Sequence, residues 1–254
     1  MIISKTIKRN VSLSKITITM VSLFFVSTTI NAQYFQKKVK GNGAITTTTR
    51  TISNYNEIGV AGSFEVTLVK GKEGEITIKS DKNLLEYIVT EVKKGNLSIK
   101  TKKGYQLSSK QKIEITIYFK EIEGVSLAGS GNIYSNDEIK SNDLKLSLAG
   151  SGNMDLKVSA NNSDTNIAGS GNMTLHGNAD SFSCSIAGSG NLNGYNLKTS
   201  ISNVKIAGSG NVKVNAINEI HAKIAGSGNV LYKGNPETVK TKSVGSGSVK
   251  RKTK

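Results

Sequence analysis

The sequence predicts an all-β protein of the parallel β-helix type, a β-solenoid with coils of about 19 residues and an irregular β-rich N-terminal end. Three observations lead to this prediction. Segments resembling IAGSGN (167–172) recur seven times at nearly constant spacing, which is the signature of a solenoid. Apolar and polar residues alternate on both sides of each copy, as they do in half-buried strands. Finally, 26 glycines, one proline and no tryptophan favour short strands and tight turns over helices.

The first 32 residues have the features of a secretory signal peptide. Lys5, Lys8, Arg9 and Lys15 form a basic start, an apolar core follows at 16–30, and Ala32 precedes the expected cleavage site. Loss of these four positive charges reduces the formal net charge from +16 to +12. The apolar core is too short and too rich in serine and threonine for a membrane span. We therefore expect a mature chain with no transmembrane segment, exported to the periplasm, the cell surface or the extracellular space.

The part of the chain before the repeats is also rich in strand patterns, although it is less regular. We expect a flexible leader over 33–45 and a single solenoid domain over 46–249, of which 46–123 forms an irregular end that covers exposed edge strands. Within it, 64–70 and 75–80 predict a hairpin around the turn 71–74. A short helical turn followed by a strand is expected over 81–92. The segment VAGSFEV (60–66) resembles a degenerate copy of the repeat.

The seven repeats occupy 124–249, and their first glycines are 18 to 21 residues apart. Each coil is predicted to contain a strand, a Gly-Ser-Gly corner, a second strand and a looser loop that absorbs the differences in length. Glycine suits the corner because it adopts positive φ freely and lets stacked corners approach to strand spacing, about 4.8 Å. The predicted corner glycines are Gly129, Gly131, Gly150, Gly152, Gly169, Gly171, Gly188, Gly190, Gly208, Gly210, Gly226 and Gly228.

Two further features of the repeats concern their polar edge and their last copy. The asparagine after each corner, as in Asn153 and Asn172, can form a hydrogen-bonded ladder when the coils are in register. In the seventh copy Ser248 replaces this asparagine, and a basic tail follows at 250–254. Charges on a final strand discourage pairing with other chains.

Several of these segments resemble a known family. The sequences NYNEIGVAGSFEVTLVKG and NLLEYIVTEVKKGNLSIKT, together with the serial AGSGN corners and the signal peptide, are similar to the head GIN domain family of auto-transporter adhesins, which are exported bacterial proteins common in Bacteroidetes. The resemblance covers roughly 50–249. It implies a parallel β-helix and an extracytoplasmic location, and it supplies no catalytic or binding residues.

The glycine-rich corners do not fit the usual ligand-binding loops. Phosphate-binding motifs need a strand followed by a helix, whereas strands flank these corners on both sides. Calcium-binding β-helices need an acidic ligand in each copy and a nine-residue period. The structural interpretation is therefore preferred, and no cofactor is expected.

Candidate catalytic and metal-binding side chains are scattered in the sequence. A glycan-cleaving site would need paired carboxylates on adjacent coils, but Asp143, Asp180, Glu219 and Glu237 fall singly or on alternate coils. His176 and His221 are expected to be exposed, with no carboxylate or cysteine in register, and Asp155 is expected to be isolated. Cys184, the only cysteine, is predicted to be a buried and inert thiol. We therefore expect no enzyme activity and no metal site.

A basic stretch over 93–120 is the one candidate binding patch. It could attract an acidic polysaccharide or an envelope surface, or it could be a solvated charged loop. Aromatic residues are too few for a specific nucleic-acid module. The candidate anion-binding residues are Lys93, Lys94, Lys100, Lys102, Lys103, Lys110 and Lys112.

The leading functional hypothesis is a non-catalytic, exported, adhesin-like solenoid that interacts with the cell envelope or another surface through an unknown ligand. One alternative is a lyase or hydrolase that acts on acidic glycans in a groove of the solenoid. Another is a structural envelope protein that associates with itself.

Overall fold

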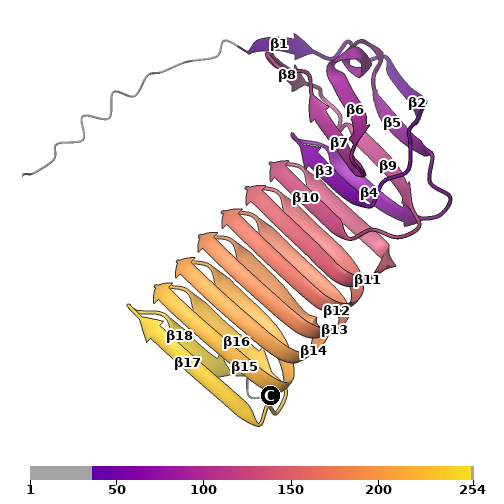
Figure 1. Cartoon of the computed structure of the whole chain (residues 1–254). Helices are drawn as coiled ribbons and strands as arrows, with labels where there is room; N and C mark the ends of the chain where they lie inside the picture. The colour runs from indigo at the N-terminus through magenta and orange to yellow at the C-terminus, as the bar shows by residue number, and fades with distance from the viewer. Residues whose placement is uncertain (1–35, 253–254) are drawn as a thin grey trace, which may run out of the picture. The chain divides into compact units, whose positions relative to one another are not determined.

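The computed structural model describes residues 36–252, so the predicted signal peptide lies outside the described residues. The chain is almost entirely β-strand, and its C-terminal part is a stack of parallel coils (Figure 1). The predicted fold class is confirmed. Among residues 36–252, no helix has the length and apolar character needed to cross a membrane.

The N-terminal part contains nine strands and one short helix. These are β1 (Lys37–Lys40), β2 (Ile45–Thr51), β3 (Glu57–Ala61), β4 (Glu65–Lys70), β5 (Glu75–Asp81), the 3-10 helix η1 (Lys82–Tyr87), β6 (Ile88–Lys93), β7 (Asn96–Thr101), β8 (Tyr105–Ser108) and β9 (Glu114–Phe119). Helix η1 and β6 lie where a helical turn before a strand was expected. Strand β1 pairs in parallel with β8, so the expectation of a flexible leader over 33–45 does not hold for residues 37–40.

The predicted hairpin at 64–80 is wrong. Strands β4 and β5 both exist, but β9 lies between them, parallel to β4 and antiparallel to β5. The other edge of β4 stacks on the first coil, where Val66 pairs with Ile133. Strand β4 is thus part of the parallel stack, and this long-range pairing overrides the local turn signal at 71–74.

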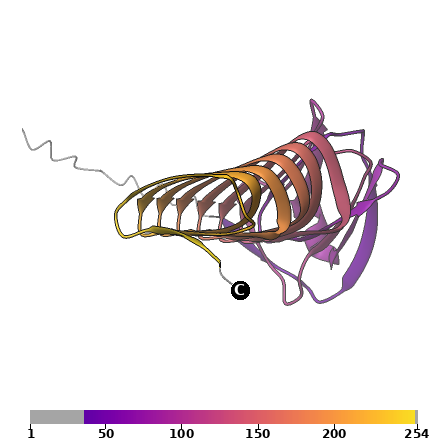
Figure 2. The same cartoon turned by 90° about the horizontal axis from the view of Figure 1, so that it is seen from below.

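The coils are formed by long strands that stack in parallel. The strands are β10 (Gly124–Gly129), β11 (Asn132–Gly150), β12 (Asn153–Gly169), β13 (Asn172–Gly188), β14 (Asn191–Gly208), β15 (Asn211–Gly226), β16 (Asn229–Lys233), β17 (Thr238–Val244) and β18 (Ser248–Arg251). Equivalent residues of successive coils are direct partners, as in the pair Ile167 and Ile186. Figure 2 shows the coils as flattened loops stacked one behind another.

The looser loop expected in each coil is instead a bend within a continuous strand. Strand β12 runs without interruption from one corner to the next, and through the bend it pairs with β13, for example Ser159 with Asn178. Polar side chains bridge the stacked bends: Asn162 Nδ2 donates to Asp143 Oδ1 (2.9 Å) and Asn178 Nδ2 donates to Ser159 Oγ (3.2 Å). The loop expectation was wrong because it ignored the hydrogen bonds that neighbouring coils supply to the bend.

Differences in coil length are absorbed by register shifts in the strand after the corner. The longest interval, from Gly129 to Gly150, contains a shift between Ser135 and Glu138. In the interval from Gly188 to Gly208, β14 shifts against β15 between Gly194 and Lys198. Such shifts accommodate extra residues and leave the corners aligned.

The corners are held by close backbone contacts that require glycine. Gly169 has a φ of +114°, and a Cβ atom on it would lie 2.6 Å from the carbonyl oxygen of Gly150. That oxygen accepts hydrogen bonds from the backbone N–H groups of Ser170 and Gly171, both at 2.9 Å. The first glycine is therefore fixed both by its conformation and by the space between coils.

The asparagine ladder expected after the corners is present. Asn172 Nδ2 donates to Asn153 Oδ1 (3.0 Å), and Asn191 Nδ2 donates to Asn172 Oδ1 (3.0 Å). The ladder starts at Glu65, which accepts a hydrogen bond from Asn132, and it ends at Ser248. Its members are Asn132, Asn153, Asn172, Asn191, Asn211, Asn229 and Ser248.

The two ends of the stack differ. At the N-terminal end, VAGSFEV forms a further corner, because Gly131 N–H donates to the carbonyl of Gly62 (3.0 Å). At the C-terminal end, the inward positions of β17 carry Val239, Thr241 and Ser243, whose partners in β15 are Ile220, Ala222 and Ile224. Two of these three inward residues are polar, which suits a last coil that meets solvent, as the terminal repeats of solenoids must.

The core consists of the inward rows of the coils, and it contains Cys184. This side chain is 1% exposed and lies beside the buried Phe182. Burial raises the pKa of the Cys184 thiol to about 12, and the nearby Asp164 charge adds to the effect. Because the thiolate is the reactive form, the thiol is expected to be inert in the folded protein.

The corner contacts predict a difference between two glycine substitutions. Gly104 has a φ of +86° with no atom near a built Cβ, so Gly104→Ala should lower the free energy of unfolding by only about 1–2 kcal/mol. Gly169→Ala adds the clash with Gly150, so we expect a loss of at least about 3 kcal/mol. Denaturant unfolding of both variants measures the difference, and equal losses would contradict the close packing of corners.

The Cys184 environment predicts how the thiol reacts. An aromatic disulfide reagent at pH 8 should leave the native protein unlabelled over hours and modify one thiol per chain in denaturant. Rapid labelling of the native protein, with its circular dichroism spectrum unchanged, would show that the inward row around Cys184 is open to solvent.

Candidate functional site

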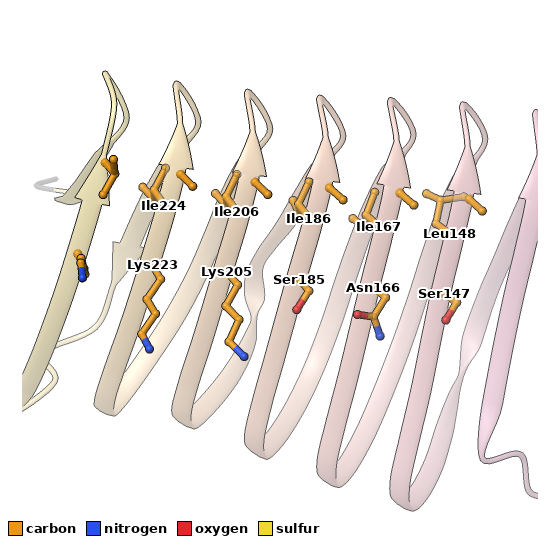
Figure 3. Close-up of a pocket in the computed structure, with 17 residues that line it drawn as sticks. Ser147, Leu148, Asn166, Ile167, Ser185, Ile186, Lys205, Ile206, Lys223 and Ile224 are labelled. Atoms are coloured by element: carbon orange, nitrogen blue, oxygen red, sulfur yellow. The ribbon is translucent and has the colours of Figure 1, made fainter. Parts of the chain in front are cut away.

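An apolar groove lies on the outer side of the strands that enter the corners. An alanine precedes the first corner glycine of every coil except the last, where Val244 precedes Gly245, and the side chain three places before this glycine is polar. Because the alanine methyl groups are short, the surface beside the corners is hollowed. We call this hollow, of about 680 Å³, the alanine groove (Figure 3). It is lined by Ser147, Leu148, Ala149, Asn166, Ile167, Ala168, Ser185, Ile186, Ala187, Lys205, Ile206, Ala207, Lys223, Ile224, Ala225, Lys242 and Val244.

The groove runs across the coils. Its residues come from six strands, β11 to β15 and β17, so at strand spacing it is about 24 Å long. Its C-terminal limit is Val244, whose side chain is 63% exposed. The groove is therefore elongated and apolar, and it is rigid because each part of its floor belongs to a hydrogen-bonded strand.

Three lysines stand in one row on the rim of the groove. Lys205 pairs in register with Lys223, which pairs with Lys242. Figure 3 shows the side chains of Lys205 and Lys223 extending in the same direction. Like charges on directly opposed strand positions repel, and no ion pair joins any of the three to a carboxylate within residues 36–252. This row is an uncompensated positive rim.

The lysine row belongs to a wider asymmetry of charge along the solenoid. Residues 124–190 contain six acidic residues and three lysines. Residues 191–252 contain ten lysines and arginines but only two acidic residues, Glu219 and Glu237. The last coils are thus strongly basic, which attracts anionic partners. This asymmetry was not predicted, although the charge of each coil can be counted directly from the sequence.

The predicted basic stretch at 93–120 is partly neutralised. Lys93 and Lys100 lie 2.9 Å and 2.8 Å from the carboxylate oxygens of Glu91, and both lower the pKa of Glu91 to about 2. Lys112 lies 3.1 Å from Glu65. The side chains of Lys94 and Lys110 are exposed, and Lys102 lies over the ring of Tyr105, 5.8 Å from its centroid. An anion site in this stretch stays a prediction.

The candidate carboxylates and histidines occupy separate places. Asp143 accepts a hydrogen bond from Asn162, and Asp180 and Glu237 are exposed. Within the described part of the chain, no three or more His, Cys, Asp or Glu side chains gather where they could hold a metal ion.

One expectation about the histidines was wrong. His176 Nε2 lies 3.1 Å from Asp155 Oδ1, and His221 Nε2 lies 3.3 Å from Glu219 Oε2, the latter without hydrogen-bond geometry. Asp155 is therefore not isolated. His176 reaches Asp155 diagonally across the stacked strands β12 and β13, whereas Glu219 lies two residues before His221 on β15; the prediction took account only of directly opposed strand positions.

Solved structures resemble this chain over most of its length. A protein from Parabacteroides distasonis titled "putative lipid binding protein" is 29% identical, with a TM-score of 0.71 over 85% of this chain and 100% of that chain. A "putative adhesin" from Parabacteroides merdae is 26% identical, with a TM-score of 0.69 over the same shares. A "putative adhesin" from Bacteroides fragilis has a TM-score of 0.79 over 84% of this chain and 100% of that chain, and its 21% identity shows a shared fold only.

The sequence comparisons place the chain in a family. None of the curated proteins with which the sequence was compared matches it. The profile of one family, described as "Putative auto-transporter adhesin, head GIN domain", matches residues 54–236, which is more than half of the chain. The resemblance inferred from the corners and the N-terminal segments is thus confirmed, and this chain belongs to the head GIN domain family that this description names.

Proposed function

We propose that this chain is an exported, non-catalytic interaction protein that binds anionic lipid of a cell envelope through the alanine groove. The observation that carries the proposal is the combination of an elongated apolar groove with an unpaired row of lysines on its rim. An anionic amphiphile has the complementary parts, an apolar chain and a negative head group.

The size of the groove suits one acyl chain. Ligand sites in proteins commonly have volumes of about 300–1,000 Å³, a range that includes the 680 Å³ of the groove. The hydrocarbon core of a bilayer is about 30 Å thick, so the chain of one leaflet extends over about 15 Å. A groove of about 24 Å accommodates that length and leaves its lysine-bearing end for the head group.

The charge of the last coils supports an anionic partner. A basic residue near an anionic membrane surface contributes about 1 kcal/mol of attraction. Lys205, Lys223 and Lys242 lie beside the groove, and they have no carboxylate partner within the described residues. A head group placed among them would relieve their mutual repulsion.

The comparisons support the same class of function. Relatives at 26% and 29% identity are titled as an adhesin and as a lipid binding protein, and the family is described as adhesin-like. Attachment to an envelope through its lipid is consistent with both titles. The signal peptide predicted at 1–32 supports export, and the separation of Asp143, Asp180, Glu219 and Glu237 supports a non-catalytic role.

Blocking the groove should abolish lipid binding. Ala187→Trp places a large ring in the floor, whereas Ala128→Trp makes the same change at an equivalent exposed alanine outside the groove. The measurement is a flotation assay with phosphatidylglycerol vesicles. We expect Ala187→Trp to bind at least about tenfold more weakly than the parent protein, which is a loss of about 1.4 kcal/mol of binding free energy. Ala128→Trp should bind as the parent does. Equal behaviour of the two variants would exclude the groove as the lipid site.

Reversing charge on the rim should remove the preference for anionic vesicles. Lys205→Glu with Lys223→Glu deletes two attractions of about 1 kcal/mol each and introduces repulsion, so affinity should fall at least about 30-fold. Lys145→Glu with Lys157→Glu changes the net charge equally at exposed positions away from the groove. An equal fall in vesicle binding for both pairs would indicate a general charge effect. In a separate activity assay, cleavage of an acidic glycan by the parent protein would support the enzyme alternative instead.

A further inference from the structure

A second basic cluster surrounds Tyr195, on the strands that leave the corners. The ammonium groups of Lys213, Lys233 and Lys252 lie 5.8, 5.7 and 5.0 Å from the centroid of the Tyr195 ring. We propose that this cluster and the adjoining asparagine ladder form a binding site for an acidic polysaccharide. The site is separate from the alanine groove, which lies on the strands that enter the corners.

The cluster is assembled by the fold from four different segments. Tyr195 lies in the irregular part of β14 where the register shifts between Gly194 and Lys198. Lys213 belongs to β15, and Lys233 is the last residue of β16. Lys252 follows β18, and its backbone N–H donates to the carbonyl of Tyr232 at 2.7 Å. The sheet thus fixes the backbone positions from which all three lysines reach one ring.

The positive charge of the cluster is not neutralised by neighbouring residues. No ion pair links these three lysines to a carboxylate within residues 36–252. Of the two acidic residues in the last coils, Glu219 contacts His221 and Glu237 is exposed. Each ammonium group is attracted to the negative face of the ring, but the three ammonium groups repel one another. A bound anion is the partner that would remove this repulsion.

A groove lined by both polar and apolar side chains continues from the cluster along the asparagine ladder. It has a volume of about 520 Å³ and extends over β13 to β16 and β18, with Asn172, Asn191, Asn211 and Asn229 along it. Lys213 lines this groove and also contacts Tyr195, so the groove and the cluster are continuous. Lys250 adds another positive charge to the lining.

The ladder leaves hydrogen-bonding groups free for a ligand. Each interior asparagine donates one amide N–H to the preceding oxygen and accepts one from the following amide. An amide has two N–H donors and two acceptor lone pairs, so one of each remains per coil. The exception is Asn191, whose Oδ1 also accepts the backbone N–H of Asn211 (3.2 Å) and which keeps only a free donor. These groups repeat every 4.8 Å or so along the stack. Such a row suits a polymer with hydroxyl groups at regular intervals.

The complete site matches an acidic polysaccharide in its chemistry. Sugar hydroxyl groups would face the free amide groups, carboxylate or sulfate groups would contact the lysines, and the apolar face of one sugar would lie on Tyr195. A single-stranded nucleic acid would need aromatic residues for successive bases, and Tyr195 is the one aromatic side chain that lines either the groove or the lysine cluster within residues 36–252. The observations therefore favour the polysaccharide.

Two matched double substitutions test the site. Lys213→Gln with Lys233→Gln removes two charges from the cluster, whereas Lys205→Gln with Lys223→Gln removes two from the alanine groove. By titration calorimetry with polygalacturonate oligosaccharides at low salt, we expect the first pair to weaken binding at least about tenfold and the second pair less than about twofold. Neutral dextran should not bind. Thermal unfolding of each variant confirms that it is folded.

A third variant separates sugar recognition from charge. Tyr195→Leu keeps all the lysines, so it should weaken polygalacturonate binding severalfold without changing the dependence of affinity on salt. Three results would overturn the proposal: equal losses in the two lysine pairs, no binding by the parent protein, or tighter binding of single-stranded DNA that depends on Lys213 and Lys233. Because Lys205 and Lys223 are intact in the cluster variants, failure here leaves lipid binding by the alanine groove unaffected.

Discussion

The structure depends on the close approach of backbones at the Gly-Ser-Gly corners. There the carbonyl oxygen of one corner glycine accepts one or two N–H groups of the next coil, and Gly150 accepts them from both Ser170 and Gly171. This contact admits no side chain at the first glycine, and it fixes the relative position of successive coils along the strand direction. With the corners aligned, every residue at the same distance from a corner stacks on its equivalents, and the inward and outward rows follow.

The alignment converts repeated residues into continuous surfaces. One alanine per coil becomes the floor of a groove, and one asparagine per coil becomes a hydrogen-bonded ladder. Rows that are constant along the stack give the same surface at every coil, whereas rows that change along the stack give each end a different surface. The row of Ser147, Asn166 and Ser185 that continues as Lys205, Lys223 and Lys242 is of the second kind. It gives the final coils a charge that the first coils lack.

The sequence contained more information about the solenoid than about its N-terminal end. The corner motif and its period determined the register, so the inward rows, the ladder and the burial of Cys184 could be predicted. The position of β9 between β4 and β5 could not be predicted. Strand β4 pairs with residues nearly 50 and 70 positions away in the sequence, and the turn at 71–74 gives no information about these contacts.

The basic clusters could have been predicted from the sequence. Lys205, Lys223 and Lys242 are separated by 18 and 19 residues, and Tyr195, Lys213, Lys233 and Lys252 by 18, 20 and 19. The basic stretch at 93–120 was predicted from lysines that are close together in the sequence. In a solenoid, however, residues about one coil apart in the sequence are the neighbours in space.

The unshifted register between β12 and β13 also affects how such a protein can evolve. Because the two edges of such a regular coil present the same pattern of donors, acceptors and inward side chains, its tandem duplication creates no new type of interface. Each duplication would lengthen both grooves by one strand spacing, about 4.8 Å, and leave the two ends unchanged. The length of each groove is therefore set by the number of coils that the gene encodes, independently of the residues that line it.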